Sequence, residues 1–177
     1  MEYAKELTEE TGVKITLTHI MAMGYAYCLA KVKRTIGRIR CGNFHAATEL
    51  GLTVLVNVDG GKDLAAVTCW DTHKKSIKEY AEFLNAKAER MKKGQDEEHK
   101  KATGSSKILP TTLLGPLLTI VGWVSFACGF SVKALGIDSR MGGHCVVTNV
   151  GAIKFQEGIA PFTPWLHAQL MCCIGSV

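Results

Sequence analysis

The sequence has few aromatic residues and no cluster of positive charge. Only 7% of its 177 residues are aromatic, and the 21 Lys and Arg residues are interleaved with 16 Asp and Glu residues. A nucleic-acid-binding surface needs clustered basic residues with aromatic partners. The composition therefore argues against DNA or RNA as a partner, while the net charge of +5 remains compatible with an anionic small ligand.

The sequence also lacks the cysteine spacings of a disulfide framework or a zinc site. No C-x-x-C pair occurs, and most of the cysteines lie in apolar runs. They are Cys28, Cys41, Cys69, Cys128, Cys145, Cys172 and Cys173. This placement predicts buried, reduced thiols in an intracellular compartment and no metal site. The acidic, polar start EYAKELTEE is not typical of a signal peptide or an Arg-rich transit peptide.

Hydrophobic periodicity predicts one domain that mixes helices and strands. We expect helices over residues 2–11, 19–34 and 77–93, and strands over 52–58, 64–70 and 166–177, the last of them buried. Asp59, Gly60 and Gly61 separate two of the strands, as in a hairpin. His19, at the start of a helix, is interpreted as a packed or capping residue. Residues 94–107 are polar and are expected to form a surface loop.

Residues 108–132 form a run of 25 residues without a charge. That length satisfies the rule for a membrane-spanning helix, so a membrane-anchored protein is one alternative. Three glycines and two prolines interrupt the run, and no second comparable run follows. A helix that is apolar on all sides can instead be buried within a domain or between subunits. We favour the second arrangement, which predicts an oligomer.

The segment GGHCVVTNVG, residues 142–151, combines an apolar strand with small polar groups. Thr148 and Asn149 are its polar members, and glycines stand at both ends. Such a strand suits a site where backbone and small polar groups meet a ligand. The pattern by itself favours a buried strand that has a hydrogen-bonded Thr and an Asn that opens a turn.

Four segments taken together resemble the catalytic domain of the dihydrolipoyl acyltransferases of 2-oxoacid dehydrogenase complexes. They are THIMAMGYAYCLAKV…LTVLVNVDGGKDLAAV, KSIKEYAEFLNAKAERMKKG, CVVTNVG and FTPW…CCIGSV. The resemblance covers nearly all of residues 1–177. It implies an α/β fold like that of chloramphenicol acetyltransferase, in which helices flank a mixed β-sheet, with 108–132 as an inserted apolar helix. It also implies trimers that can build larger cores.

The same resemblance implies a chemistry and a site. In this family a His base deprotonates a thiol, the thiolate attacks a thioester carbonyl, and a hydroxyl donates a hydrogen bond to the oxyanion. Coenzyme A and a dihydrolipoyl group are the two thiol substrates. Thr148 corresponds to the oxyanion donor. Asn149 and Gly151 correspond to the turn after it, and Phe162, Thr163 and Pro164 to a loop that lines the substrate channel.

The sequence departs from the family at the base. The family base lies in a His-x-x-x-Asp-Gly motif, which follows none of His19, His45, His73, His99, His144 and His167. The first family strand is also not recognised, so we expect a piece incomplete at both ends or a short paralogue without the base. His144 and His167 are weighed as substitutes, and Cys145 and Cys172 as nucleophiles; none has an evident geometry or activating neighbour in the sequence.

Three hypotheses follow from the sequence. The first is an acyltransferase domain in which Thr148 stabilises the oxyanion and the base lies outside the chain. The second is a non-catalytic subunit that uses the same fold to assemble in a larger complex. The third is the membrane-anchored protein. For the first two we expect an intracellular, reducing compartment, which is the mitochondrial matrix in a eukaryote and the cytoplasm otherwise.

Overall fold

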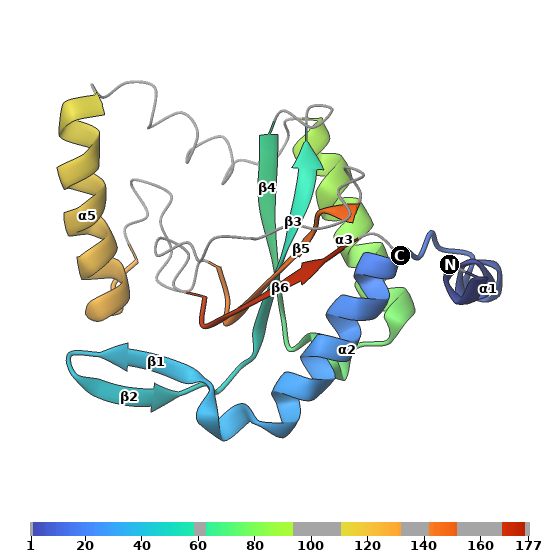
Figure 1. Cartoon of the computed structure of the whole chain (residues 1–177), viewed down its shortest axis with the longest axis horizontal. Coiled ribbons are helices and arrows are strands. Elements are labelled where there is room, and N and C mark those ends of the chain that lie inside the picture. The colour runs from blue at the N-terminus through green and yellow to red at the C-terminus, as the bar shows by residue number, and fades with distance from the viewer. Residues whose placement is uncertain (1, 59–62, 94–110, 132–141, 152–167, 176–177) are drawn as a thin grey trace.

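A computed structural model describes residues 2–58, 63–93, 111–131, 142–151 and 168–175 (Figure 1). Its longer helices are α1 (Glu2–Thr11), α2 (Leu17–Lys31), α3 (Ile77–Lys92) and α5 (Thr111–Ala127), and two short 3-10 turns are η1 (Lys33–Thr35) and η3 (Thr72–Lys74). Its strands are β1 (Gly37–Arg40), β2 (Asn43–Ala46), β3 (Gly51–Val58), β4 (Asp63–Trp70), β5 (Cys145–Asn149) and β6 (Leu170–Ile174).

The main sheet is mixed, as the sequence predicts. Its strand order is β4-β3-β5-β6. β4 is antiparallel to β3, whereas β5 runs parallel to both β3 and β6. β1 and β2 form a separate antiparallel hairpin. The turn expected at residues 59–61 lies outside the described residues, but the antiparallel register of β3 and β4 confirms the hairpin.

The core lies between α2, α3 and one face of this sheet (Figure 1). Alternate residues of each strand point to that face because side chains alternate along a strand. The strand residues that reach it include Leu52, Val54, Ala65, Val67, Cys145, Val147 and Ile174. Tyr80 of α3 is fully buried against them. Each buried Leu or Val contributes roughly 1.5–3 kcal/mol to folding, so this face holds the sheet and the two helices together.

Side-chain caps fix the starts of α2 and α3. Ser76 accepts a hydrogen bond from the Glu79 N–H, and the Glu79 carboxylate accepts one from the Ser76 N–H. Thr16 and His19 make a similar box, in which the Thr16 N–H donates to His19 Nδ1 over 3.0 Å. His19 is also buried and lies edge-on to the Tyr80 ring. The interpretation of His19 as a packed or capping residue is confirmed.

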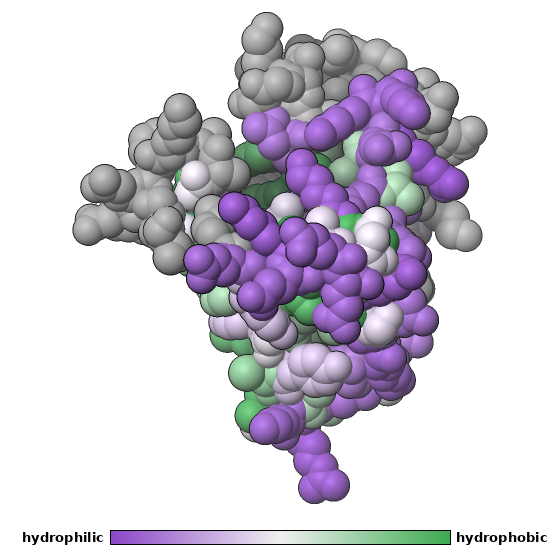
Figure 2. Space-filling view, turned by 90° about the vertical axis from the view of Figure 1, so that its right-hand side faces the viewer, coloured by the Kyte–Doolittle hydropathy of each residue, from purple (hydrophilic) through white to green (hydrophobic). Residues whose placement is uncertain are grey.

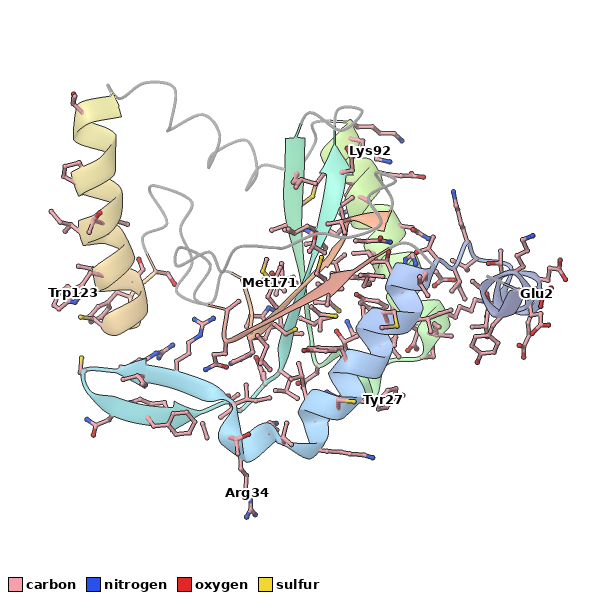
Figure 3. All side chains as sticks on the ribbon, viewed as in Figure 1. Glu2, Tyr27, Arg34, Lys92, Trp123 and Met171 are labelled. Carbon is pink, nitrogen blue, oxygen red and sulfur yellow. The ribbon has the colours of Figure 1, made fainter. Side chains whose placement is uncertain are left out.

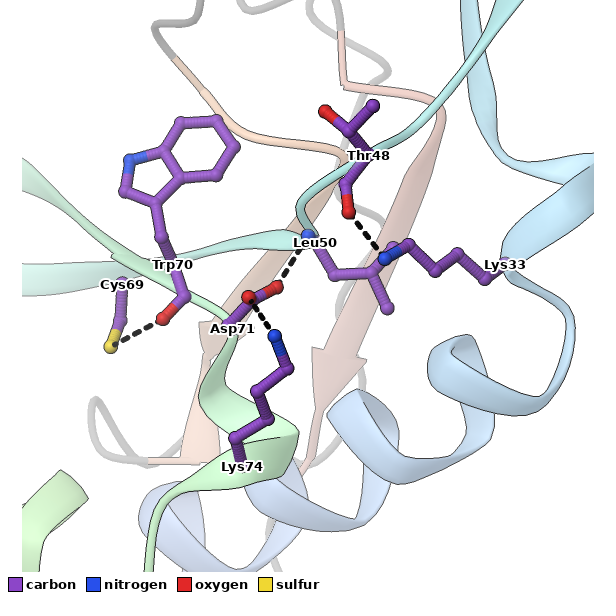
Figure 4. Close-up of polar contacts among 7 residues, drawn as sticks. All are labelled: Lys33, Thr48, Leu50, Cys69, Trp70, Asp71 and Lys74. Atoms are coloured by element: carbon purple, nitrogen blue, oxygen red, sulfur yellow. Dashed lines mark hydrogen bonds and ion pairs between the residues drawn. The ribbon is translucent and has the colours of Figure 1, made fainter.

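Asp71 ties the end of β4 to the start of β3 (Figure 4). Its backbone is left-handed, with φ of 50°, a conformation in which Asp is among the best tolerated residues after glycine. One carboxylate oxygen accepts from the Leu50 N–H over 3.0 Å, and the other pairs with Lys74 Nζ at 2.6 Å. The Lys74 hydrogen bond, aided by the Leu50 N–H, lowers the pKa of Asp71.

Two predictions from the C-terminal segment and the cysteines need correction. Among the strands that the structure describes, β6 lies at the edge of the sheet; Leu170 and Cys173 are exposed while Ile174 is buried. Its apolar composition suggested burial because neither the sheet order nor the strand's place in it is visible in one segment. All seven cysteines are free, but Cys28, Cys41 and Cys173 are exposed. The prediction of buried thiols holds for Cys69 and Cys145.

Helix α5 stands apart from α2 and α3 (Figure 1). Its chief contact with the other described elements is with β1. Ile120 and Trp123 are 62% and 66% exposed, so the helix is not buried within the described part of the chain. In the residues that the structure describes, no helix combines the length and the apolar character needed to cross a membrane.

Candidate active site

Thr148 lies near the end of β5, on the sheet face opposite the core. Cys145 and Val147 point toward α2 and α3, so the alternation of side chains directs Val146 and Thr148 to the other side. The register places Cys173 of β6 beside Thr148 and Thr53 of β3 beside Val146. Thr148 is half-buried. Its hydroxyl therefore belongs to a sheet face that is distinct from the packed core.

That face carries a second pair of hydroxyls. Thr53 and Thr68 lie opposite one another in β3 and β4, and their Oγ1 atoms are 2.8 Å apart. Thr53 is fully buried. A buried hydroxyl is stable where another polar group satisfies it, and these two satisfy each other. Thr53 and Thr68 thus form a polar pair across β3 and β4, and β3 is the neighbour of β5, the strand that carries Thr148.

Asn149 fixes the end of β5 against the start of α2. Its Nδ2 donates to Thr18 Oγ1 over 2.8 Å, a contact between residues 131 positions apart. Val150 extends the pairing with β6, because its N–H donates to the Ile174 carbonyl over 3.0 Å. Gly151 follows and is half-buried. These contacts hold in place the backbone that follows Thr148, since hydrogen bonds to neighbouring elements restrict its movement.

His144, just before β5, joins the starts of three strands. Its ring Nδ1 accepts a hydrogen bond from the Gly51 N–H over 3.1 Å, and the backbone N–H of His144 donates to the Gly51 carbonyl over 2.7 Å. Its carbonyl accepts from the N–H groups of Gln169 and Leu170. The ring packs edge-on to Trp70. His144 is thus a structural junction between β3, β5 and β6.

Burial and charge keep His144 neutral. Desolvation, with a smaller effect of the Arg38 guanidinium, lowers its pKa from 6.5 to about 4. Arg38 also donates from Nη2 to the Gly143 carbonyl over 2.9 Å. Gly143 itself has φ of +60°, and a Cβ there would lie 2.6 Å from the Gly51 carbonyl oxygen. Only glycine fits at this crossing, where two backbones meet.

Solved structures share the fold of this chain. A probable dihydrolipoamide acetyltransferase from Listeria monocytogenes superposes with a TM-score of 0.61 and 13% identity, over 97% of this chain and 55% of that one. The dihydrolipoamide acetyltransferase of Azotobacter vinelandii superposes with a TM-score of 0.57 and 14% identity, over 92% and 50%. The fold is that of an acyltransferase catalytic domain. The fold that the sequence resemblance implies is therefore confirmed.

A third structure of this acyltransferase fold is a truncated catalytic core of the 2-oxoacid dehydrogenase multienzyme complex from Thermoplasma acidophilum. It matches with a TM-score of 0.57 and 12% identity, over 99% of this chain and 62% of that one. This chain thus spans between half and two thirds of the length of these structures. No protein-family model matches the chain, and no curated protein matches it by sequence.

The described histidines of this acyltransferase fold have structural or surface positions. Nδ1 of His19 and of His144 each accepts a backbone N–H, so neither nitrogen is available as a base. His45 is exposed on the β1–β2 hairpin, and His73 lies in η3. His99 and His167 lie outside the described residues.

The two cysteines weighed as nucleophiles are protonated at neutral pH. Burial, with a smaller effect of Cys172, raises the pKa of Cys145 to about 12. Burial and then Cys173 raise the pKa of Cys172. A thiolate is the reactive form, so these positions disfavour nucleophilic catalysis. Among the residues that the structure describes, no group of His, Cys, Asp and Glu could hold a metal ion.

Thr148, Asn149 and Gly151 are near neighbours in the sequence, and the Asn149 side chain points to α2, on the sheet face opposite Thr148, so the predicted site stays a prediction. Phe162, Thr163 and Pro164 lie outside the described residues. The junction at His144 and the Thr18 contact were not predicted, because their partners are 93 and 131 residues away along the chain. The sequence signal for the junction was Gly143 and Gly51, because two backbones that cross closely require glycine.

Proposed function

We propose that the chain is an acyltransferase domain that exchanges an acyl group between coenzyme A and a dihydrolipoyl or similar thiol. The proposal rests on two polar residues, Thr148 and Asn149, at the end of β5, which is an inner strand of the sheet. The chain has the fold of acyltransferase catalytic domains. Residues 1–177 are treated as one such domain, with 94–107 as a surface loop and 108–132 as an inserted apolar segment.

Thr148 is the proposed oxyanion donor. When a thiolate attacks the thioester carbonyl, the carbonyl oxygen becomes negative and a positioned hydroxyl stabilises it. Thr148 suits the role because it is half-buried and lies on the sheet face away from the core, and because Asn149 anchors the adjacent backbone. The base that receives the thiol proton is proposed to lie outside this chain.

The remaining site residues are proposed to shape the channel. Asn149 and Gly151 set the turn that follows β5, and the Thr18 contact supports this role for Asn149. Phe162, Thr163 and Pro164 are proposed to line the path by which the substrates reach Thr148. Coenzyme A and the dihydrolipoyl group are substrates in this proposal, and no metal takes part.

The test measures acetyl transfer from acetyl coenzyme A to dihydrolipoamide by an active protein that contains this chain and its base, as the wild type, Thr148→Ala and Thr148→Ser. We expect Thr148→Ala to lower kcat by ~10²–10³-fold, because one oxyanion hydrogen bond is lost. Thr148→Ser keeps the hydroxyl and should retain most activity. Coenzyme A binding, followed by calorimetry, should persist in all three. Unchanged turnover in Thr148→Ala removes Thr148 from the site.

A non-catalytic subunit is the second candidate. It is favoured by the structural use of His19 and His144 and by the exposed apolar residues of α5. On this view the chain assembles, as a trimer or within a larger complex, and transfers no acyl group at any concentration. Free cysteines support an intracellular, reducing compartment for either candidate, the mitochondrial matrix in a eukaryote. Absent turnover by the protein that contains this chain and its base, together with absent coenzyme A binding, favours this candidate.

A further inference from the structure

The tip of the β1–β2 hairpin and the C-terminal end of α5 each carry a cysteine. Cys41 lies in the two-residue turn between Arg40 and Asn43, and Cys128 directly follows α5. Figure 1 shows the hairpin lying beneath the orange, C-terminal end of α5. The two thiols belong to segments that are 87 residues apart in the sequence. Their elements make the chief contact between α5 and the rest of the described structure.

Two pairs of residues lie where the hairpin approaches the end of α5. The Arg40 side chain lies so close to Gly129 that a Cβ there would be 2.9 Å from Nη1 and 3.0 Å from Cζ. Cys41 directly follows Arg40 and Cys128 directly precedes Gly129, so the two cysteines flank this contact, and the thiol of Cys41 acts electrostatically on that of Cys128. Gly129 has φ of +80°, which favours glycine, and its contact with Arg40 places Cys128 next to the hairpin turn that carries Cys41.

The turn conformation makes Cys41 an unusual choice. Cys41 and Gly42 have φ of 49° and 81°, so both central residues are left-handed, as a type I′ hairpin turn requires. Asn, Asp or Gly is the ordinary residue at the first of these positions, because a Cβ is strained there. Cys41 is exposed and Cys128 is half-buried. An oxidant in solution therefore reaches Cys41 first.

We propose that Cys41 and Cys128 form a reversible disulfide that fastens the end of α5 to the hairpin when the protein meets hydrogen peroxide. The Cys41 thiolate attacks the peroxide O–O bond, takes one oxygen to become a sulfenic acid and releases hydroxide. The Cys128 thiol then attacks that sulfur, an S–S bond forms, and water leaves. The two thiols lose two electrons and the peroxide becomes two water molecules. Small-molecule thiols reverse the reaction by exchange.

The surroundings of Cys128 agree with a reaction in which Cys41 is oxidised first. Burial, followed by the charge and hydrogen bond of Cys41, raises the pKa of Cys128, so that its thiol is protonated at neutral pH. A protonated thiol reacts slowly with peroxide, and Cys128 is less exposed than Cys41, so Cys128 is assigned as the second, resolving thiol. The proposal concerns the junction of α5 and the hairpin, and it does not depend on acyl transfer by Thr148.

The test maps disulfides in the reduced full chain after treatment with hydrogen peroxide and alkylation of the remaining thiols. Cleavage after Lys and Arg places Cys41 in residues 41–62 and Cys128 in residues 108–133, and each peptide contains a single cysteine. We expect one linked pair of these two peptides, lighter than their sum by two hydrogen atoms. Dithiothreitol should release both peptides.

Matched variants distinguish a specific Cys41–Cys128 disulfide from non-specific oxidation of the other thiols. Cys128→Ser and Cys41→Asn should abolish the linked peptides; Asn suits the left-handed turn, so the hairpin is kept. Cys173→Ser, which changes an exposed cysteine elsewhere, should leave the linkage unchanged. Recovery of Cys41 and Cys128 as separately alkylated or overoxidised peptides, or pairing of Cys41 with Cys28 or Cys173 at an equal rate, overturns the proposal.

Discussion

At the scale of single residues, His144 shows how one side chain connects strands that are distant in sequence. Its ring nitrogen and backbone bind Gly51 in β3 and the start of β6, while Gly143 beside it leaves room for the crossing. A buried imidazole that accepts a backbone hydrogen bond must stay neutral to do so, because protonation turns the acceptor into a donor. His144 therefore couples stability to pH.

We expect the protein to lose stability as the pH falls through the range set by His144. In the unfolded chain this group takes up a proton near pH 6.5, but in the folded chain only near pH 4. Between these values the unfolded state binds more protons, so the contribution is complete above about pH 6.5 and is lost toward pH 4. His144 accounts for about 2 kcal/mol of the free energy of unfolding between about pH 7 and pH 5.

Urea unfolding at both pH values measures this effect in the wild-type chain, His144→Asn and His45→Gln. The Asn side chain can accept the Gly51 hydrogen bond but does not titrate, so the pH dependence should shrink. His45 is exposed, and its variant should behave like the wild type. An NMR titration of the His144 ring gives the folded pKa directly. A folded value near 6.5 contradicts the assignment.

Site residues differ in how far the sequence alone locates them. Thr148 and Asn149 stand out locally, because they are polar residues in an apolar strand, and β5 forms where expected. Their roles in acyl transfer stay predictions. Thr18 and Arg38 carry no local signal, since each acts through a partner on another element. Sequence patterns identify the first kind of residue and not the second.

At the scale of elements, α3 is the helix whose bounds follow most directly from its own sequence. Ser76 and Glu79 form the capping box at its start, and its apolar residues form one stripe toward the sheet. The exposed side of α3 and α1 contributes to the largely hydrophilic face in Figure 2. Local chemistry and tertiary packing agree here, and the helix was predicted within a residue at its C-terminal end.

Removing this cap should weaken the helix by a defined amount. Ser76→Ala deletes the acceptor of the Glu79 N–H and should lower the free energy of unfolding by about 1 kcal/mol. Ser76→Thr keeps a hydroxyl and should cost much less. Urea unfolding monitored by circular dichroism measures both variants. Equal stability of Ser76→Ala and Ser76→Thr would show that the box contributes little.

β6 illustrates an element that its own sequence describes incompletely. Leu170–Ile174 is apolar throughout, and it is a strand as predicted. Its burial was predicted wrongly because an apolar run does not reveal whether a neighbour covers both edges and both faces. Only the order β4-β3-β5-β6 makes it an edge strand.

At the scale of the whole molecule, apolar residues are exposed on α5 and on the hairpin beside it. They are Ile39, Phe44, Ile120, Trp123 and Phe130, each more than half exposed. Figure 3 shows Trp123 on the opposite side of the molecule from Glu2. Exposed apolar side chains gathered on one side mark an interaction surface. We expect this surface, formed by α5 and the β1–β2 hairpin, to join copies of the chain.

Charged substitutions on that surface should disperse the oligomer. Trp123→Lys and Ile120→Lys place a charge where an interface requires apolar contact, so the mass in sedimentation velocity should fall to the 19.2 kDa of one chain. Tyr27→Lys changes an exposed residue of α2 that Figure 3 shows far from α5, and should leave the mass unchanged. A wild-type chain that is already monomeric contradicts self-association and leaves a different protein as the partner.

The sequence by itself determined the type and approximate bounds of α1, α2, α3 and the β3–β4 hairpin, because periodicity, caps and turn residues act over a few positions. It also determined the likeness to the acyltransferase fold, through the order of its segments. The tertiary structure alone decided the strand order, the junction at His144, the edge position of β6 and the meeting of Cys41 with Cys128. These depend on contacts between distant residues, whose geometry no local pattern encodes.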